Sequence, residues 1–363
     1  MRNSIETYLL RFTFVSNWKL CLSIFLPLIV LFFATPSFKI IKEHWDPILI
    51  QSQSPFIPHD YPDHSHASKL AFRFFPAIII GFLHLKVLGI IIWQYLNGIF
   101  LFYVVGYVVE KKTSDKLTAL YSILLTAFIF TGKVSFINFK DTFDSLILAL
   151  LILCFTINNR LIIYFILLIV GFTDERGLIC SGFLFLYYLF FSTYKTKNKF
   201  YLAVIIASWI SYFLIRFSLG YFLGLKTSTG GFDFKTMALN LNFAPLSIWQ
   251  TFEGGWLLVI LFLKILYQKN RLSFLLIVSQ FCLVLLVAFM VFDVTRSLVY
   301  AFPLIIIAIL TLFKQLEIEK VNSYLFYSVI ISFIYPVYSS AGNTNIWLTP
   351  FPLKLLFEFF TNS

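Results

Sequence analysis

The sequence contains little charge and little cysteine. Only 12% of its 363 residues are Asp, Glu, Lys or Arg, whereas soluble proteins average about 25%. The four cysteines lie inside apolar runs and form no CxxC pair, which argues against a disulfide scaffold and against a zinc framework. The GxxxxGK loop of nucleotide-binding proteins and the HExxH motif of zinc proteases are also missing.

Apolar residues dominate instead. They make up 60% of the chain, and the mean hydropathy is +0.87. A soluble domain of this size could not hide so much apolar surface in one core, so the solvent must be lipid. These values exclude a soluble enzyme with a single anchor, a disordered chain and a DNA-binding module. We expect an all-α polytopic membrane protein in which residues 1–363 form one transmembrane domain.

Apolar runs of suitable length indicate about 11 membrane-embedded helices. The runs are Leu20–Ala34, Val87–Val109, Leu117–Ser135, Thr142–Ile157, Leu161–Phe172, Leu178–Phe191, Tyr201–Leu223, Ser247–Leu266, Leu272–Phe292, Leu298–Phe313 and Ser323–Val337. Residues 161–191 contain two runs that are too short to cross the bilayer, and they flank a charged apex. That pattern predicts a broken helical hairpin.

The formal net charge of +11 indicates the orientation. Lysine and arginine concentrate in alternate short loops, which by the positive-inside rule face the cytoplasm. This places the N terminus inside and the C terminus outside. The segments 35–86 and 224–246 and the tail 339–363 then lie outside, together with most of the acids. No partner is expected from nucleic acid, and the excess charge matches an anionic membrane surface.

Residues 43–66 of the first outer segment contain four of the five histidines, among them His59 and His66, and the acids Asp46 and Asp60. Histidines mixed with carboxylates can bind a divalent metal ion or act as general acids and bases. Two prolines interrupt the run, so a solvated loop is the simpler alternative. The sequence requires no cofactor, and the divalent metal remains an open alternative.

The end of this segment predicts an amphipathic helix in the membrane interface. His66, Lys69 and Arg73 stand at i, i+3 and i+7 and share one face. Pro76 is expected to end or kink the helix. Its cationic edge either extends to lipid head groups or holds a substrate phosphate.

Two further charged breaks interrupt the apolar pattern. Asp174, Glu175 and Arg176 follow one another between the two short runs, where unpaired charge would be expensive unless it faced a cavity. Asp293 and Arg296 lie between two later runs at the spacing of a local ion pair. Either break can be a turn that reaches water or a part of a substrate site.

The order of one span, a long outer segment with an early acid, an interfacial helix and many further spans resembles the GT-C superfamily of integral-membrane glycosyltransferases. The resemblance covers mainly the first 200 residues, and no Asp-x-Asp motif is present. It implies a sugar donor linked to a polyprenyl phosphate and a bacterial plasma membrane location. By position, Asp46 would be the catalytic base, with Asp60 second and a neighbouring histidine, His59 or His66, as a further alternative. Lys69, Arg73, Arg176 and Arg296 would stabilise the departing phosphate.

Two other classes fit the same pattern. A transporter or flippase for lipid-linked glycans would also place charges and broken helices in the membrane, usually in inverted halves. A polysaccharide polymerase of the O-antigen type would share the spans and the outer arginines. A non-enzymatic scaffold is the third class. In all of them the partners are membrane lipids, and no residue pattern specifies an oligomeric state.

Overall fold

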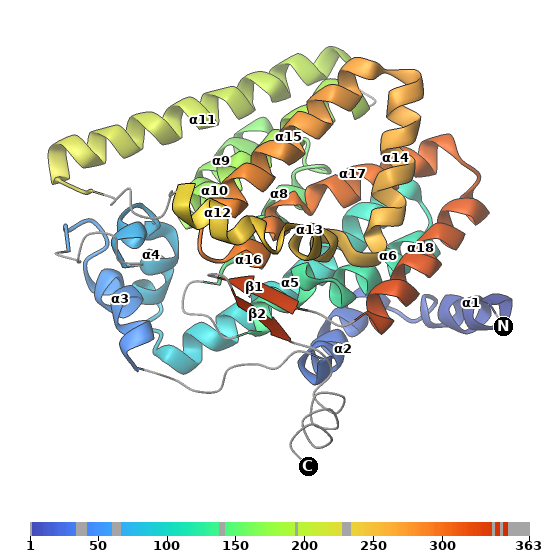
Figure 1. Cartoon of the computed structure of the whole chain (residues 1–363), viewed down its shortest axis with the longest axis horizontal. Helices are drawn as coiled ribbons and strands as arrows, with labels where there is room; N and C mark the ends of the chain where they lie inside the picture. The colour runs from blue at the N-terminus through green and yellow to red at the C-terminus, as the bar shows by residue number, and fades with distance from the viewer. Residues whose placement is uncertain are drawn as a thin grey trace.

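A computed structural model of the chain describes residues 2–33, 42–59, 67–137, 142–192, 195–226, 234–335, 338–341 and 344–347. These residues are almost entirely helical, with one small antiparallel pair of strands (Figure 1). The helices of the first half are α1 (Arg2–Phe12), α2 (Trp18–Phe33), α3 (Lys42–Gln53), η1 (Ala67–Phe72), α4 (Phe74–Phe82), α5 (Val87–Thr113), α6 (Lys116–Phe128), α7 (Phe130–Lys133), η2 (Val134–Phe136), α8 (Asp144–Leu153), α9 (Arg160–Thr173), α10 (Glu175–Leu186) and η3 (Tyr187–Phe191).

The second half continues in the same way. Its elements are α11 (Lys195–Leu223), α12 (Phe234–Leu241), α13 (Ala244–Phe252), η4 (Glu253–Gly255), α14 (Trp256–Lys269), α15 (Arg271–Phe289), α16 (Val294–Leu298), η5 (Val299–Ala301), α17 (Pro303–Gln315), α18 (Ile318–Ile334), β1 (Tyr338–Ala341) and β2 (Thr344–Trp347).

Five stretches of the described chain are long and apolar enough to cross a membrane. They are Val87–Thr113, Asn198–Leu223, Ala244–Lys269, Arg271–Phe289 and Val294–Gln315. A sixth is formed if Lys116–Phe128 and Phe130–Phe136 count as one span, bent by 72°. Apolar but shorter helices occupy Trp18–Leu31, Asp144–Leu153 and Arg160–Thr173. The protein is therefore helical and multi-spanning, while the expected number of 11 embedded segments is not confirmed.

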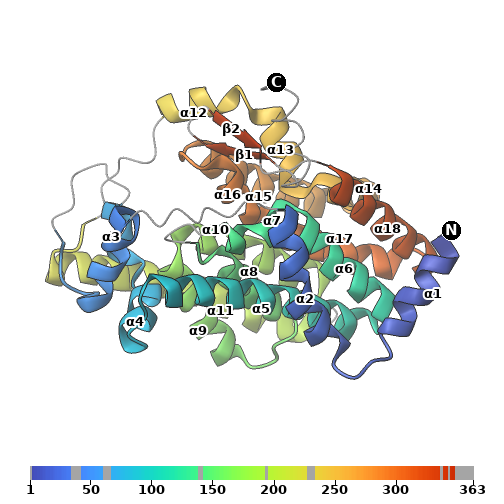
Figure 2. The same cartoon turned by 90° about the horizontal axis from the view of Figure 1, so that it is seen from below.

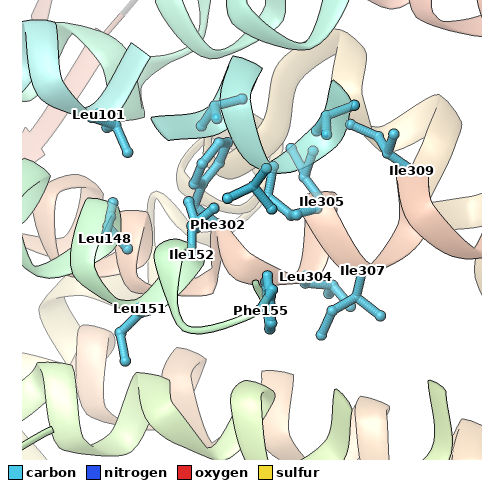
Figure 3. Packing of buried hydrophobic residues seen from close by; sticks show 14 of the residues in the cluster. Leu101, Leu148, Leu151, Ile152, Phe155, Phe302, Leu304, Ile305, Ile307 and Ile309 are labelled. Carbon is cyan, nitrogen blue, oxygen red and sulfur yellow. The ribbon is translucent and has the colours of Figure 1, made fainter. Parts of the chain in front are cut away.

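The helices differ in how deeply they are buried. In the span Val294–Gln315, 89% of the most apolar 18-residue stretch is buried inside the protein. Helix α17 of this span is apolar on nearly all sides, as expected of a helix at the centre of a bundle. Phe302 and Ile305 belong there to one buried apolar cluster that also includes Leu101 of α5 and Leu148 of α8 (Figure 3). In α11 the buried share is 17%, and Phe217 is 73% exposed. This helix runs along the edge of the bundle and offers an apolar face to lipid (Figure 1).

Basic loops expected on one side of the membrane meet at one end of the bundle. Lys19 pairs with Glu110 at the end of α5, and Lys116 donates to the Thr13 carbonyl oxygen at 3.2 Å. At the same end Lys314 donates to the Phe191 carbonyl oxygen at 3.1 Å. These contacts join α2 to α5, α6 to the residue after α1, and α17 to η3.

The interfacial helix predicted from His66 onward is not formed as one helix. Residues 67–72 make the 3-10 helix η1, the chain turns at Arg73, and α4 begins at Phe74. Pro76 neither ends nor kinks this helix, because it lies in the first turn, where a missing N–H leaves no bond unmade. Arg73 therefore points into the protein, where it is 8% exposed, instead of forming a cationic edge.

Two other outer segments contain more structure than expected. The segment 224–246 includes α12 and the start of α13. In the C-terminal segment, β1 and β2 form an antiparallel pair, and the Ser340 N–H donates to Thr295 Oγ1 at 2.8 Å. The strands thus lie against α16, as both views of the fold show (Figures 1 and 2).

Candidate functional site

Arg73 anchors the first outer segment to the apex between α9 and α10. Its Nη1 lies 2.9 Å from Asp174 Oδ2. Its Nη2 and Nε donate to Glu175 Oε1 and Oε2 at 2.8 and 3.1 Å. A guanidinium that binds a carboxylate with two parallel bonds is held in one orientation. The rings of Phe74 and Phe172 stack with centroids 4.3 Å apart and also hold α4 against α9.

Arg176 extends the network from the apex toward α16. Its Nε and Nη2 donate to Asp174 Oδ1 and Oδ2 at 2.9 and 2.6 Å. Its Nη1 donates to Ser297 Oγ at 2.7 Å, and its guanidinium carbon lies 5.0 Å from the ring centre of Tyr300. Asp174 also accepts the Arg176 N–H at 2.9 Å and so caps α10. One carboxylate thus fixes both the helix start and the arginine.

Asp144 connects the network to a third arginine. It is the first residue of α8 and is fully buried. Arg296 Nε donates to Asp144 Oδ2 at 2.9 Å, and Arg176 Nη2 lies 3.9 Å from Asp144 Oδ1. Asp293 caps α16 by accepting the Arg296 N–H at 3.3 Å. The expected Asp293–Arg296 contact is therefore made through the backbone, while the Arg296 side chain reaches Asp144.

We call these seven residues the charged cluster: Arg73, Asp144, Asp174, Glu175, Arg176, Asp293 and Arg296. It contains three guanidinium groups and four carboxyl groups. Burial alone would raise the pKa of the Asp174 carboxyl, but the guanidinium groups of Arg176 and Arg73 outweigh it and hold that pKa well below its usual range. For Asp293 burial prevails, and its pKa is raised despite Arg296.

A small recess opens beside the cluster. It measures about 10 Å³, close to the space that one water molecule needs, and is lined by Arg176, Ser297 and Tyr300 on one side and by Val284 and Val287 of α15 on the other. Tyr300 is 1% exposed, and its hydroxyl has no hydrogen-bond partner. Asp144 Oδ1 is likewise buried without a hydrogen bond. Buried polar atoms in native proteins nearly always have partners, so these two atoms indicate a place for water or for a polar ligand.

Six of the eleven predicted site residues meet in the cluster: Arg73, Asp174, Glu175, Arg176, Asp293 and Arg296. Asp46 is half-buried on α3 and takes no part in these ion pairs. His59 contacts Ser54 and lies apart from them. Asp60 and His66 lie outside the described residues, and of Lys69 the structure describes the backbone in η1.

Asp144 was not predicted as a site residue. It follows Thr142 at the beginning of an apolar run, and the run as a whole indicates an ordinary span. The available signal was an acid near the start of that apolar run. Three or more His, Cys, Asp or Glu side chains do not gather into a metal-binding group anywhere in the described ranges, so the divalent metal expected as an alternative has no support there.

The ion pairs predict how stability depends on pH. Because the pKa values of Asp174 and Glu175 are lowered in the folded state, their contribution is complete above the unfolded values of about 4 and disappears as the pH falls through the folded values. We expect Asp174→Asn to have a lower thermal unfolding midpoint than the parent protein at pH 7. As the pH falls below about 4, the difference between the two midpoints should shrink. Melting curves in detergent across this range test it.

The control is Glu317→Gln, which removes an exposed i,i+3 pair with Lys320. It should leave the melting curve unchanged throughout. A constant difference between Asp174→Asn and the parent from neutral to acid pH would contradict the assignment of the ionised carboxylate.

Comparison with known proteins found no matching family model, curated protein or solved structure. The class therefore rests on the fold and the site alone. They define a helical, multi-spanning membrane protein whose charged residues from four separate segments meet at one end of the bundle.

Proposed function

We propose that the protein is an integral-membrane glycosyltransferase of the GT-C type. It would move a sugar from a polyprenyl-phosphate donor to a lipid, glycan or protein acceptor on the non-cytoplasmic face of a bacterial plasma membrane. The observation that carries the proposal is the charged cluster, in which Arg73, Arg176 and Arg296 come from three different outer segments. Intramembrane charges of this kind usually mark a substrate site.

The position of the cluster supports this orientation. It lies at the opposite end of the bundle from the contacts of Lys19, Lys116 and Lys314, so the positive-inside rule puts it outside. The first outer segment packs onto the bundle through Arg73, as an outer segment that contributes to catalysis would.

The recess beside Arg176 has room for about one water, so a lipid-linked phosphate would approach Arg176 at the mouth of the recess, beside α15. Two of its lining residues, Val284 and Val287, belong to α15, and on the same helix Leu283 and Leu286 are 44% and 45% exposed. A polyprenyl chain could lie along this apolar surface with its phosphate at Arg176 and the Tyr300 hydroxyl. Arg73 and Arg296 are held by carboxylates, so we assign them to positioning, together with Lys69 of the same outer segment.

The base would be a carboxylate at the outer surface. Asp46 follows Trp45, which packs in one apolar cluster with Phe143, the residue before Asp144. This packing brings α3 to the start of α8. In the reaction the acceptor oxygen attacks the anomeric carbon, the bond to the phosphate oxygen breaks, and the acceptor proton passes to Asp46. The departing phosphate keeps the electron pair, and Arg176 stabilises its charge.

The test is turnover of a labelled polyprenyl-phosphate sugar by the protein in nanodiscs. We expect Asp46→Asn to lower turnover by about 10²–10⁴-fold, the usual effect of losing a general base, while the melting temperature stays near that of the parent. Glu110→Gln, at the opposite end of the bundle, is the matched control and should keep full turnover. Sugar-independent movement of lipid-linked glycans in liposomes, with no transfer product, would instead establish the flippase alternative and overturn the proposal.

A further inference from the structure

A second group of buried polar side chains lies where α7, η4 and α18 meet, outside the charged cluster. Its central residue is Glu253, which is fully buried in the stretch Ala244–Lys269. The backbone of Glu253 has φ 45° and ψ −120°, a conformation that residues with a side chain rarely adopt. Such strain persists where the surrounding structure enforces it, often at functional sites.

Close packing holds the three elements together around Glu253. The Gly254 N–H donates to Ser332 Oγ of α18 at 3.0 Å. A Cβ on Gly254 would lie 2.1 Å from the Ser328 carbonyl oxygen, so only glycine permits this approach. On the other side, α7 packs against α13, the helix that ends at Phe252 just before Glu253. Glu253 is thus enclosed between α7 and α18.

Several polar atoms of this group have no hydrogen-bond partner. They include both carboxylate oxygens of Glu253, both amide atoms of Gln250, and the hydroxyl oxygens of Thr131, Ser247 and Ser328. Each of these residues is fully buried. Ser247, Gln250 and Glu253 follow one another at intervals of three, which places them along one face of α13 and η4. The elements that carry them are in contact, since α13 packs against α7 and η4, and η4 packs against α18. So many unpartnered oxygens on neighbouring elements indicate a bound species that supplies their missing contacts.

Lys133 does not supply these contacts. Its Nζ donates to the carbonyl oxygen of Phe128, the last residue of α6, where a cation complements the helix dipole. Within the part of the chain that the structure describes, Glu253 forms no ion pair of 4.0 Å or less. An ionised carboxylate in an apolar interior is strongly unfavourable unless a cation neutralises it.

We propose that Glu253, Gln250, Ser247, Ser328 and Thr131 form a binding site for a monovalent cation of the sodium type. All of the unpartnered oxygens are hard donors, which suit hard cations. A single carboxylate among neutral oxygens matches a single positive charge, whereas divalent ions usually take more carboxylates. Broken helices supply such sites in membrane proteins, and here both α6–α7 and α13–η4 are interrupted.

The site lies next to α16, which contributes Arg296 to the charged cluster. Both α7 and α13 contact α16 (Figure 2). A bound cation would hold these elements in place and thereby support the position of Arg296. The site itself does not depend on the proposed glycosyl transfer.

Thermal unfolding of the purified full-length protein tests the site without any sugar substrate. We expect the unfolding midpoint to rise in a saturable manner when NaCl replaces choline chloride at equal ionic strength, since a ligand of the folded state stabilises it. Glu253→Gln should abolish the rise. Ser328→Ala removes one neutral oxygen and should raise the half-saturating sodium concentration by about tenfold.

Glu110→Gln is the control, because it removes a carboxylate at the opposite end of the bundle and should keep the sodium response. Equal midpoints in choline and sodium would overturn the proposal and would leave water or a proton as the partner of Glu253. A sodium response that persists unchanged in Ser328→Ala and in Glu253→Gln would overturn it as well. If Glu253→Gln does not fold, Ser328→Ala in the parent background decides.

Discussion

Replacing Asp144 by alanine is expected to destabilise the folded protein by about 3–5 kcal/mol, the usual effect of removing one partner from a buried ion pair. Asp144 is fully buried, and it faces Arg296 at 2.9 Å and Arg176 at 3.9 Å. Without it the Arg296 guanidinium loses its ion pair with this carboxylate in an interior from which water is excluded. The free energy of unfolding in mixed detergent micelles measures the effect.

A double-mutant cycle separates the ion pair from a simple cavity. Suppose that Asp144→Ala lowers the free energy of unfolding because the ion pair with Arg296 is lost. Then Asp144→Ala combined with Arg296→Met should be less destabilising than the sum of the two single changes. Glu110→Ala breaks the more exposed Lys19–Glu110 pair and should change stability by about 1 kcal/mol or less. Additive effects of Asp144→Ala and Arg296→Met would contradict the pairing.

The arginines of the cluster were predictable because each interrupts an apolar pattern. Arg176 and Arg296 occupy short charged breaks between apolar runs, and unpaired charge at such places needs a partner. The partner of Arg176, Asp174, is local, but the partners of Arg73 and Arg296 were not predictable because they lie more than a hundred residues away in the chain. Arg73 was assigned to a cationic helix edge from its spacing alone, whereas the turn before Phe74 directs it inward to Asp174.

The residues missed by sequence analysis lie inside runs that are apolar on average. Asp144 begins α8, Lys133 ends α7, and Glu253 stands between α13 and α14. A window average of hydropathy hides a single charge among fifteen or so apolar neighbours. The sharper signal is the ionisable residue itself, since a buried charge within a span needs a partner whatever surrounds it.

The fold shows the same division between local and tertiary effects. Long apolar runs in the sequence predicted α5, α11 and α15 well, because each run is long enough to cross a membrane. The breaks at Ile129 and at Glu253 depend on packing: Gly132 approaches the Thr126 carbonyl oxygen, and Gly254 approaches that of Ser328. Such contacts join residues from separate turns or helices, so hydropathy does not reveal them.

The second large effect is expected at Arg176. If this guanidinium stabilises the departing phosphate, Arg176→Lys should lower kcat by about 10²–10³-fold, as the removal of a preorganised donor to developing charge usually does. Lysine keeps the positive charge, but it cannot bind Asp174 with two bonds and donate to Ser297 at the same time. Turnover of the labelled polyprenyl-phosphate sugar, with kcat and KM measured separately, tests this.

The controls distinguish chemistry from folding. Ser297→Ala removes the hydroxyl that accepts from Arg176 Nη1, and it should lower kcat by a smaller factor because the two bonds to Asp174 still hold the guanidinium. Arg271→Gln, at the start of α15 on the basic end, should keep full turnover. A group that stabilises the transition state by about 1.4 kcal/mol already changes the rate about tenfold. If kcat of Arg176→Lys stays within about twofold of the parent value and the melting temperature is unchanged, Arg176 has no part in the catalytic step.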